Sequence, residues 1–155
     1  MKIKLVFAVI MFPLLTACGG AQKPEMTPLE IQSMQSRQFS ASYNNVFAST
    51  MSVFQDLGYT VTGADKDTGL ISAESATGSD VAYAIFTGST LTSQTRATAF
   101  VERLKNKTNV RLNFVEARQT SSGWGQTNRQ DQPIMDASIY QNAFERIENA
   151  IFIRR

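Results

Sequence analysis

The sequence contains no histidine, and its only cysteine is Cys18. These scarcities remove the commonest general base and the commonest thiol nucleophile of enzymes. They also remove the side chains that build most zinc sites. Nothing in the spacing of the 13 acidic residues singles out a catalytic pair or a metal site. We therefore predict a protein that is not an enzyme, with no catalytic residue, no metal ion and no cofactor.

Neither sign of charge dominates the chain, which has 15 basic and 13 acidic residues and a formal net charge of +2. The excess comes from Lys2 and Lys4, which lie in a segment that we expect to be removed. A neutral surface provides no electrostatic basis for binding nucleic acid or an anionic bilayer. We therefore expect no nucleic-acid partner.

The chain also lacks an apolar run long enough to span a membrane, which takes roughly 20 residues. Its longest run, Leu5 to Leu15, follows Lys2 and Lys4 and is typical of a secretory signal. The run ends in Leu15-Thr16-Ala17-Cys18, which resembles the signal box of bacterial lipoproteins. The resemblance implies cleavage after residue 17 and acylation of Cys18. An ordinary signal peptide with an incidental Cys18 is the alternative.

The resemblance also implies a location. In these lipoproteins the cysteine carries several fatty chains, among them palmitate, and two or more chains anchor a protein stably. Gly19 rather than Asp follows the cysteine, which favours the outer membrane, with the domain facing the periplasm, over retention in the inner membrane. Residues 18–38 contain few large apolar side chains, so we expect a lipidated cysteine followed by a flexible tether.

Residues 39–155 are predicted to form one domain. Apolar residues recur at spacings of three and four between Phe39 and Leu57, as on one face of a helix. We expect Gly58 to end this helix at positive φ, and Gly69 to adopt positive φ in a turn between two strands. The strands are expected over 59–63 and 70–75.

Two later segments predict a second hairpin and a second helix. The segments from Thr95 to Leu104 and from Val110 to Phe114 read as antiparallel strands, and Asp136 is expected to cap a helix with a regular apolar stripe. Residues 78–93 are either a strand extension or a loop. The predicted fold is α+β: a helix, an antiparallel meander of about four strands, and a helix, with both helices on one face of the sheet.

The candidate binding residues lie in or beside a polar stretch, 120–133, that is expected to be the longest loop. Trp124 is the only tryptophan, is flanked by glycines and has Arg118 and Arg129 nearby. A tryptophan on a surface loop is a common anchor for a partner. We expect Trp124 to be exposed in the isolated domain; the alternative is that it covers a sheet edge.

The core pattern resembles that of small bacterial lipoproteins. The resemblance rests on Val46-Phe47-Ala48, on Gln55-Asp56-Leu57-Gly58-Tyr59 and on Gly69-Leu70-Ile71-Ser72-Ala73, with a closing helix that starts near Asp136. It implies a helix-grip domain similar to the C-terminal domains of the accessory lipoprotein of the outer-membrane barrel assembly complex. The implied role is that of a non-catalytic accessory module with an envelope protein partner. A module that binds a lipid or peptidoglycan fragment is the alternative, and a hydrolase is a remote one.

Overall fold

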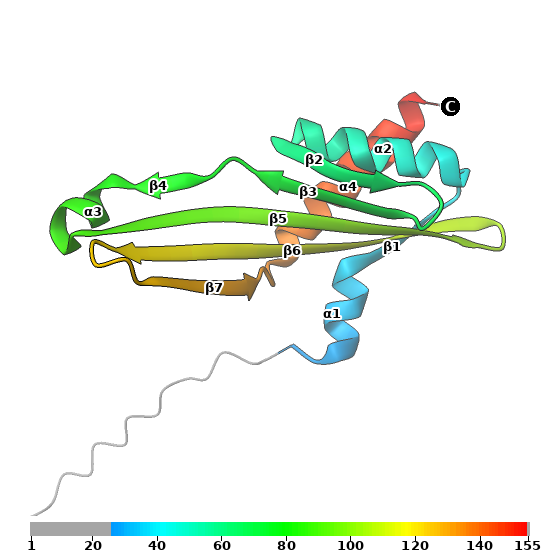
Figure 1. Ribbon diagram of the computed structural model, residues 1–155. Helices are drawn as coiled ribbons and strands as arrows, with labels where there is room; N and C mark the ends of the chain where they lie inside the picture. The colour runs from blue at the N-terminus through cyan, green and yellow to red at the C-terminus, as the bar shows by residue number, and fades with distance from the viewer. Residues whose placement is uncertain (1–25, 155) are drawn as a thin grey trace, which may run out of the picture.

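The computed structural model of this protein describes residues 26–154. The expected signal peptide, 1–17, and the expected lipid site, Cys18, lie outside these residues. Figure 1 shows the order of elements along the chain, which is α1 (Pro28–Gln35), β1 (Ser36–Phe39), α2 (Tyr43–Asp56), β2 (Tyr59–Asp65), β3 (Leu70–Ser75), β4 (Gly78–Asp80), α3 (Val81–Thr87), β5 (Ser89–Leu104), β6 (Lys107–Ser122), β7 (Thr127–Pro133) and α4 (Ala137–Ile153).

The strands form one antiparallel sheet of seven strands in the order β1-β6-β5-β3-β2, with β4 added beside β5 and β7 added beside β6. The predicted α+β class is confirmed, although the predicted meander had about four strands. The sheet is built on the hairpin of β5 and β6, in which each strand has 16 residues and the register is continuous from Ser89 opposite Ser122 to Leu104 opposite Lys107.

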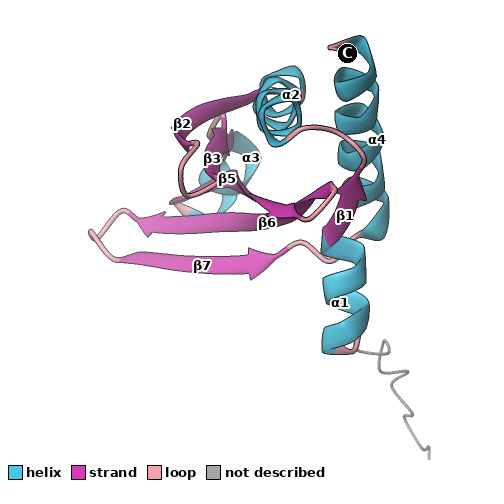
Figure 2. Cartoon of the chain, turned by 90° about the vertical axis from the view of Figure 1, so that its right-hand side faces the viewer, coloured by secondary structure: helices cyan, strands magenta, loops and turns pink. Residues whose placement is uncertain are grey.

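Helices α2 and α4 cover one face of this sheet, as predicted (Figure 2). The Ser42 side chain accepts a hydrogen bond from the Asn45 amide at the start of α2, and Asp136 caps α4 in the same way. Gly58, which follows α2, has φ +84°, and Gly69, in the turn between β2 and β3, has φ +80°. Both glycines therefore adopt the predicted positive φ.

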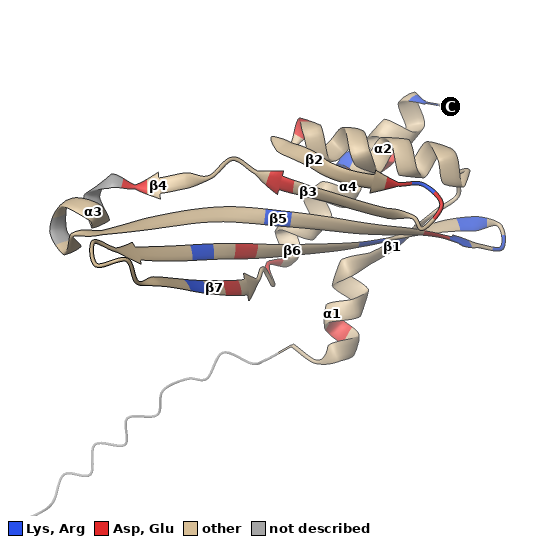
Figure 3. Ribbon diagram, viewed as in Figure 1, with Lys and Arg blue, Asp and Glu red and all other residues tan. Residues whose placement is uncertain are grey.

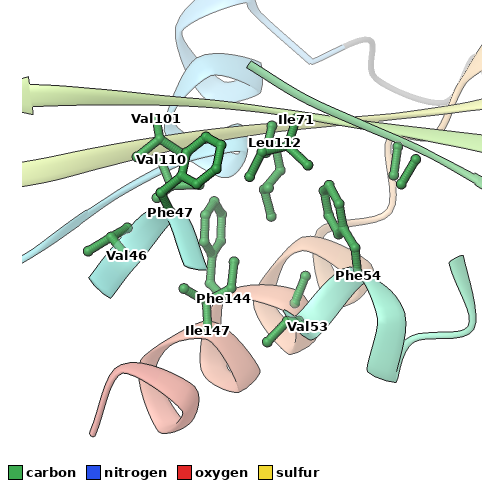
Figure 4. Close-up of a cluster of buried hydrophobic side chains, with 14 of the residues drawn as sticks. Val46, Phe47, Val53, Phe54, Ile71, Val101, Val110, Leu112, Phe144 and Ile147 are labelled. Atoms are coloured by element: carbon green, nitrogen blue, oxygen red, sulfur yellow. The ribbon is translucent and has the colours of Figure 1, made fainter. Parts of the chain in front are cut away.

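Buried side chains of α2 and α4 fill the space between these helices and the covered half of the sheet (Figure 4). Phe54, Phe114 and Tyr140 form a chain of aromatic contacts, with centroid distances of 6.4 Å and 5.2 Å. The Tyr140 hydroxyl donates to the Ile134 carbonyl at 2.9 Å, so the one polar group of this aromatic chain is bonded. The core is a layer of buried side chains between the helices and the sheet.

The prediction of a flexible tether up to residue 38 is wrong for its last part. Thr27 and Glu30 form a capping box that starts α1, and Pro28 occupies the first turn. The next segment, β1, pairs with β6 from Ser36 opposite Arg111 to Phe39 opposite Thr108. Helix α1 could not be recognised from apolar periodicity, because its sequence is short and weakly amphipathic. It is stabilised by its cap and by its contacts with α4 and β1.

Two further expectations need correction. Within residues 78–93, neither a strand extension nor a loop accounts for the whole segment: it forms β4, then α3, and then the start of β5. The stretch 120–133 is not a long loop, because β6 continues to Ser122 and β7 pairs with it from Thr127 to Pro133. Only a turn of four residues, 123–126, remains between the two strands.

Candidate binding surface

Half of the long hairpin projects beyond the helices. We call this part the arm and define it as residues 78–95 together with 115–133. The buried core includes Ala97, Ala99, Leu112 and Phe114 of β5 and β6, whereas in the arm only Ala117 is buried among the described side chains. Figure 1 shows the arm extending to the left, away from α2 and α4, with β4 and α3 on one side and β7 on the other.

Both faces of the arm are polar. Side chains alternate between the faces of a strand, so the continuous register assigns each residue of the arm to the face shared with Phe114 or to the opposite face. The face continuous with the core carries Thr95, Ser93, Glu116, Arg118, Thr120 and Gln130. The opposite face carries Gln94, Thr92, Ala117, Gln119, Arg129 and Asp131.

The end of the arm carries Trp124 in the turn between β6 and β7. The Ser122 amide donates to the Gln126 carbonyl at 2.9 Å, the Gly125 amide donates to the Ser122 carbonyl at 3.0 Å, and Gly125 has φ +80°. The turn is therefore closed by its own backbone. Trp124 is 95% exposed, as predicted, and the alternative in which it covers a sheet edge is excluded.

Helix α3 lies beside this turn. Asp80 caps its start, Gly88 ends it at φ +66°, and a Cβ added to Gly123 would lie 3.7 Å from the Gly88 carbonyl oxygen. On α3, Ile85 is 76% exposed and Tyr83 is 36% exposed. We call Trp124, Ile85 and Tyr83 the arm tip. The end of the arm therefore carries two largely exposed apolar side chains, Trp124 and Ile85, and a partly covered one, Tyr83.

No charged residue occurs in 81–95 or in 119–128, the two stretches that form the outer part of the arm (Figure 3). The charged residues that flank these stretches in the sequence are Asp80, Arg96, Arg118 and Arg129. Exposed apolar side chains in an uncharged surround are a feature of interface centres, where charged residues are depleted and aromatic residues enriched. The arm tip is thus suited to contact with another apolar surface.

Arg118 and Arg129, the other two predicted partner-binding residues, do not join Trp124 in one cluster. Arg118 donates two hydrogen bonds to Glu116, at 2.9 and 3.0 Å, on the face continuous with the core. Arg129 donates to Asp131 at 3.0 Å on the opposite face. Each guanidinium is thus paired within its own strand, and hydrogen bonding to Glu116 raises the pKa of Arg118.

The face opposite the helices carries a charged network that crosses three strands. Asp131 of β7 pairs with Arg129 on its own strand and reaches Arg96 of β5 across β6. The hydrogen bond from Arg129, with the nearby charge of Arg96, holds the pKa of the Asp131 carboxyl below its ordinary value. Between β5 and β3, the Gln94 side-chain amide donates to the Glu74 carboxylate and to the Ser75 carbonyl. This network ties the base of the arm to the body of the sheet.

Two recesses of the surface lie beside the helices and the turns of the covered half of the sheet. One, of about 240 Å³, lies between α1 and α4 beside Met34 and Phe144. Another, of about 320 Å³, lies beside Tyr43 and Phe100, where the Arg103 guanidinium stacks on the Tyr43 ring at 4.3 Å.

Among residues 26–154, no group of three or more acidic, cysteine or histidine side chains is placed to hold a metal ion. In the same range, no helix is both long enough and apolar enough to cross a membrane.

Ile85 and Tyr83 were not predicted to lie at the same end of the domain as Trp124. The available signals were Asp80 and Gly88, which are a typical N-cap and C-terminal glycine for the short helix between them. The uncharged stretches 81–95 and 119–128 were a second signal, because two such stretches that pair in a hairpin must form one uncharged end.

No family model matches the sequence, and the search of curated proteins found no match. Among solved structures, the chain is similar to the crystal structure of a DUF4468 family protein from Bacteroides ovatus. That similarity covers 75% of this chain and 84% of the other, with a TM-score of 0.39 and 9% sequence identity. A similarity of this size carries no argument about function.

Proposed function

We propose that this protein is a lipid-anchored accessory module of the cell envelope that binds a protein partner through the arm tip and catalyses no reaction. The observation that carries the proposal is the 95% exposure of Trp124 at the uncharged end of the arm. Tryptophan and tyrosine in well-desolvated contacts supply much of the binding energy of protein interfaces. No described side chain needs Trp124 for the packing of the core.

The proposed anchor is a lipid on Cys18, in the outer membrane and on the periplasmic side, supported by the basic start, the apolar run and the Leu15–Cys18 box. Residues 19–27 separate Cys18 from α1 and span at most about 30 Å when fully extended. This is shorter than the tether expected from the sequence, because α1 and β1 belong to the domain. The domain therefore works close to the bilayer, and its partner is an envelope protein within that reach.

A small-ligand module is supported less well. A lipid or peptidoglycan fragment held between the helices and the sheet needs an apolar cavity there. Phe47, Phe54 and Phe144 occupy that space and are at most 6% exposed. A hydrolase would need a nucleophile and a base, and the absence of histidine argues against one.

The test is photocrosslinking in intact cells with benzoylphenylalanine in place of Trp124. Asn106, which is exposed in the turn between β5 and β6 at the opposite end of the hairpin, is the matched control. The proposal expects a discrete protein adduct from position 124 and none from position 106. Adducts with lipid alone, or equal adducts from both positions, would rule out a protein partner at the arm tip.

The Trp124→Ala substitution separates binding from folding. We expect the melting temperature to change by no more than about 2 °C, because the side chain buries almost nothing. We expect affinity for the crosslinked partner to fall about 30-fold or more, the equivalent of 2 kcal/mol at an interface anchor. A large fall in melting temperature with affinity intact would show that Trp124 supports the fold.

A further inference from the structure

The outer edge of β7 is open. The inner edge of β7 pairs with β6, and among the described residues no strand pairs with its outer edge. All seven residues, from Thr127 to Pro133, are exposed. An edge of this length presents a row of unpaired backbone groups, which natural proteins normally cover, interrupt or pair.

The register shows which backbone groups the open edge presents. The Ile134 amide donates to the Phe114 carbonyl, and the Ser122 amide donates to the Gln126 carbonyl. In an antiparallel pair the hydrogen-bonded positions alternate, so the even-numbered residues of β7 face β6. The amides of Thr127, Arg129 and Asp131 therefore point outward. Pro133 has no amide and ends the series.

This edge is complementary to itself. When two copies of β7 are placed antiparallel about Gln130, each Arg129 lies opposite the Asp131 of the other copy, and these outward-facing residues form the hydrogen-bonded pairs. Moving the centre to Arg129 places two guanidiniums opposite each other, and moving it to Asp131 places two carboxylates opposite each other. Opposite charges in cross-strand positions stabilise a pairing and like charges destabilise it, so charge selects the register about Gln130.

We propose that the outer edge of β7 pairs with the same edge of a second copy of this chain, antiparallel and centred on Gln130. The contact obeys two-fold symmetry, in which the same patch serves both copies. It extends each sheet across the interface and leaves the arm tips free. The site is independent of the proposed partner contact at Trp124.

The dimer is expected to be weak and reversible. One edge of seven residues buries less than the roughly 1,200–2,000 Å² of a stable interface. Anchoring in one membrane would favour it, because tethering raises the effective concentration of the second copy. The decisive readout is therefore a covalent trap of the predicted register.

Gln130→Cys provides this trap. Gln130 is a non-hydrogen-bonded position at the two-fold axis, where opposite Cα atoms lie about 4.5 Å apart, within the range for a disulfide. Gln132→Cys is the matched control: it is on the same face and is also exposed, but it lies opposite Asn128. Its two copies would be offset by four residues, about 13 Å along the strand, which a disulfide does not bridge.

The trap is measured in a chain that starts at Gly19, which lacks Cys18 and retains every residue of the core. Under mild oxidation we expect disulfide-linked dimer from Gln130→Cys at a rate at least 10-fold above that of Gln132→Cys. Equal rates, or no dimer from either variant, would overturn the proposal.

A charge exchange tests the register independently. In a Gln130→Cys background, Arg129→Asp places only carboxylates at the four charged positions, and Asp131→Arg places only guanidiniums there. Each variant alone should lose most of its crosslinked dimer, whereas an equal mixture should recover a mixed dimer with both pairs complementary. A mixture that remains monomeric, or single variants that crosslink like the parent, would refute this pairing. Far-ultraviolet circular dichroism confirms that both variants are folded.

Discussion

Gly69 and Gly58 have nearly the same left-handed backbone but different surroundings, so the two positions separate the cost of conformation from the cost of space. Their φ values are +80° and +84°. A Cβ added to Gly58 meets nothing within 4 Å, whereas one added to Gly69 would lie 2.0 Å from the Val101 carbonyl oxygen. That oxygen belongs to the backbone of β5, so it cannot move aside as a flexible side chain would.

The magnitudes follow from these surroundings. Gly58→Ala should cost only the left-handed penalty of about 1–2 kcal/mol. Gly69→Ala adds the displacement of β5 and the loss of the 2.8 Å hydrogen bond from the Val101 amide to the Gly69 carbonyl. The lost bond is worth about 1 kcal/mol and the overpacking about 1–3 kcal/mol. We expect a total of about 3–6 kcal/mol for Gly69→Ala.

The assay is urea unfolding followed by circular dichroism, with melting temperature as a second measure. At about 4 °C per kcal/mol for a domain of this size, Gly58→Ala should lower the melting temperature by about 4–8 °C. Gly69→Ala should lower it by 12 °C or more by the same scaling. Equal losses of stability in the two variants would refute the reasoning, because they would mean that the close approach of β5 to the turn contributes nothing.

Two other predictions concern the anchor and the pH dependence of stability. Cys18→Ser should move the protein from the membrane fraction to unprocessed precursor or soluble periplasm, and unchanged membrane partition would contradict lipidation. The hydrogen bond from the Asp67 amide lowers the pKa of Asp65, so its stabilisation is present above the unfolded pKa of about 3.9 and is lost as pH falls through the lower folded value. Asp65→Asn should therefore lower the urea midpoint at pH 7 but have little effect near pH 2, and an equal effect at both would disprove this linkage.

The parts of the fold that bury apolar side chains could be predicted from the sequence. The spacing of Val46, Phe47, Val53 and Phe54 predicted α2, and the alternation of Val110, Leu112 and Phe114 predicted the covered half of β6. In both elements one face is buried, so apolar residues recur in the sequence with the period of the helix or of the strand. Gly58 and Gly69 were predictable because a left-handed backbone favours glycine.

The arm and α1 could not be predicted in this way. Thr127–Pro133 is wet on both faces, so its alternation leaves no apolar pattern, and its composition is that of a loop. Helix α1 is stabilised by a capping box and by contacts with α4 and β1. Neither of these leaves a periodic apolar pattern in the sequence. The exposure of Trp124 could be predicted because the apolar patterns of the core do not include it. Ile85 and Tyr83 lie at the same end of the domain only because β5 pairs with β6, which the sequence pattern of residues 78–93 did not indicate.

The long strand β5 passes from a covered environment to one exposed on both faces, and this has a consequence for folding. A slip of one residue in the inner half would expose Ala97, Ala99 and Val101, whereas a slip in the outer half would bury or expose little. The pairing register of β5 with β6 in the outer half is therefore set by the inner half, because the register is continuous between them. During folding, the strands of the arm should pair after those of the inner half, starting from the core. In the native state, the amide protons of the arm should exchange with solvent through local opening much faster than those of the inner half.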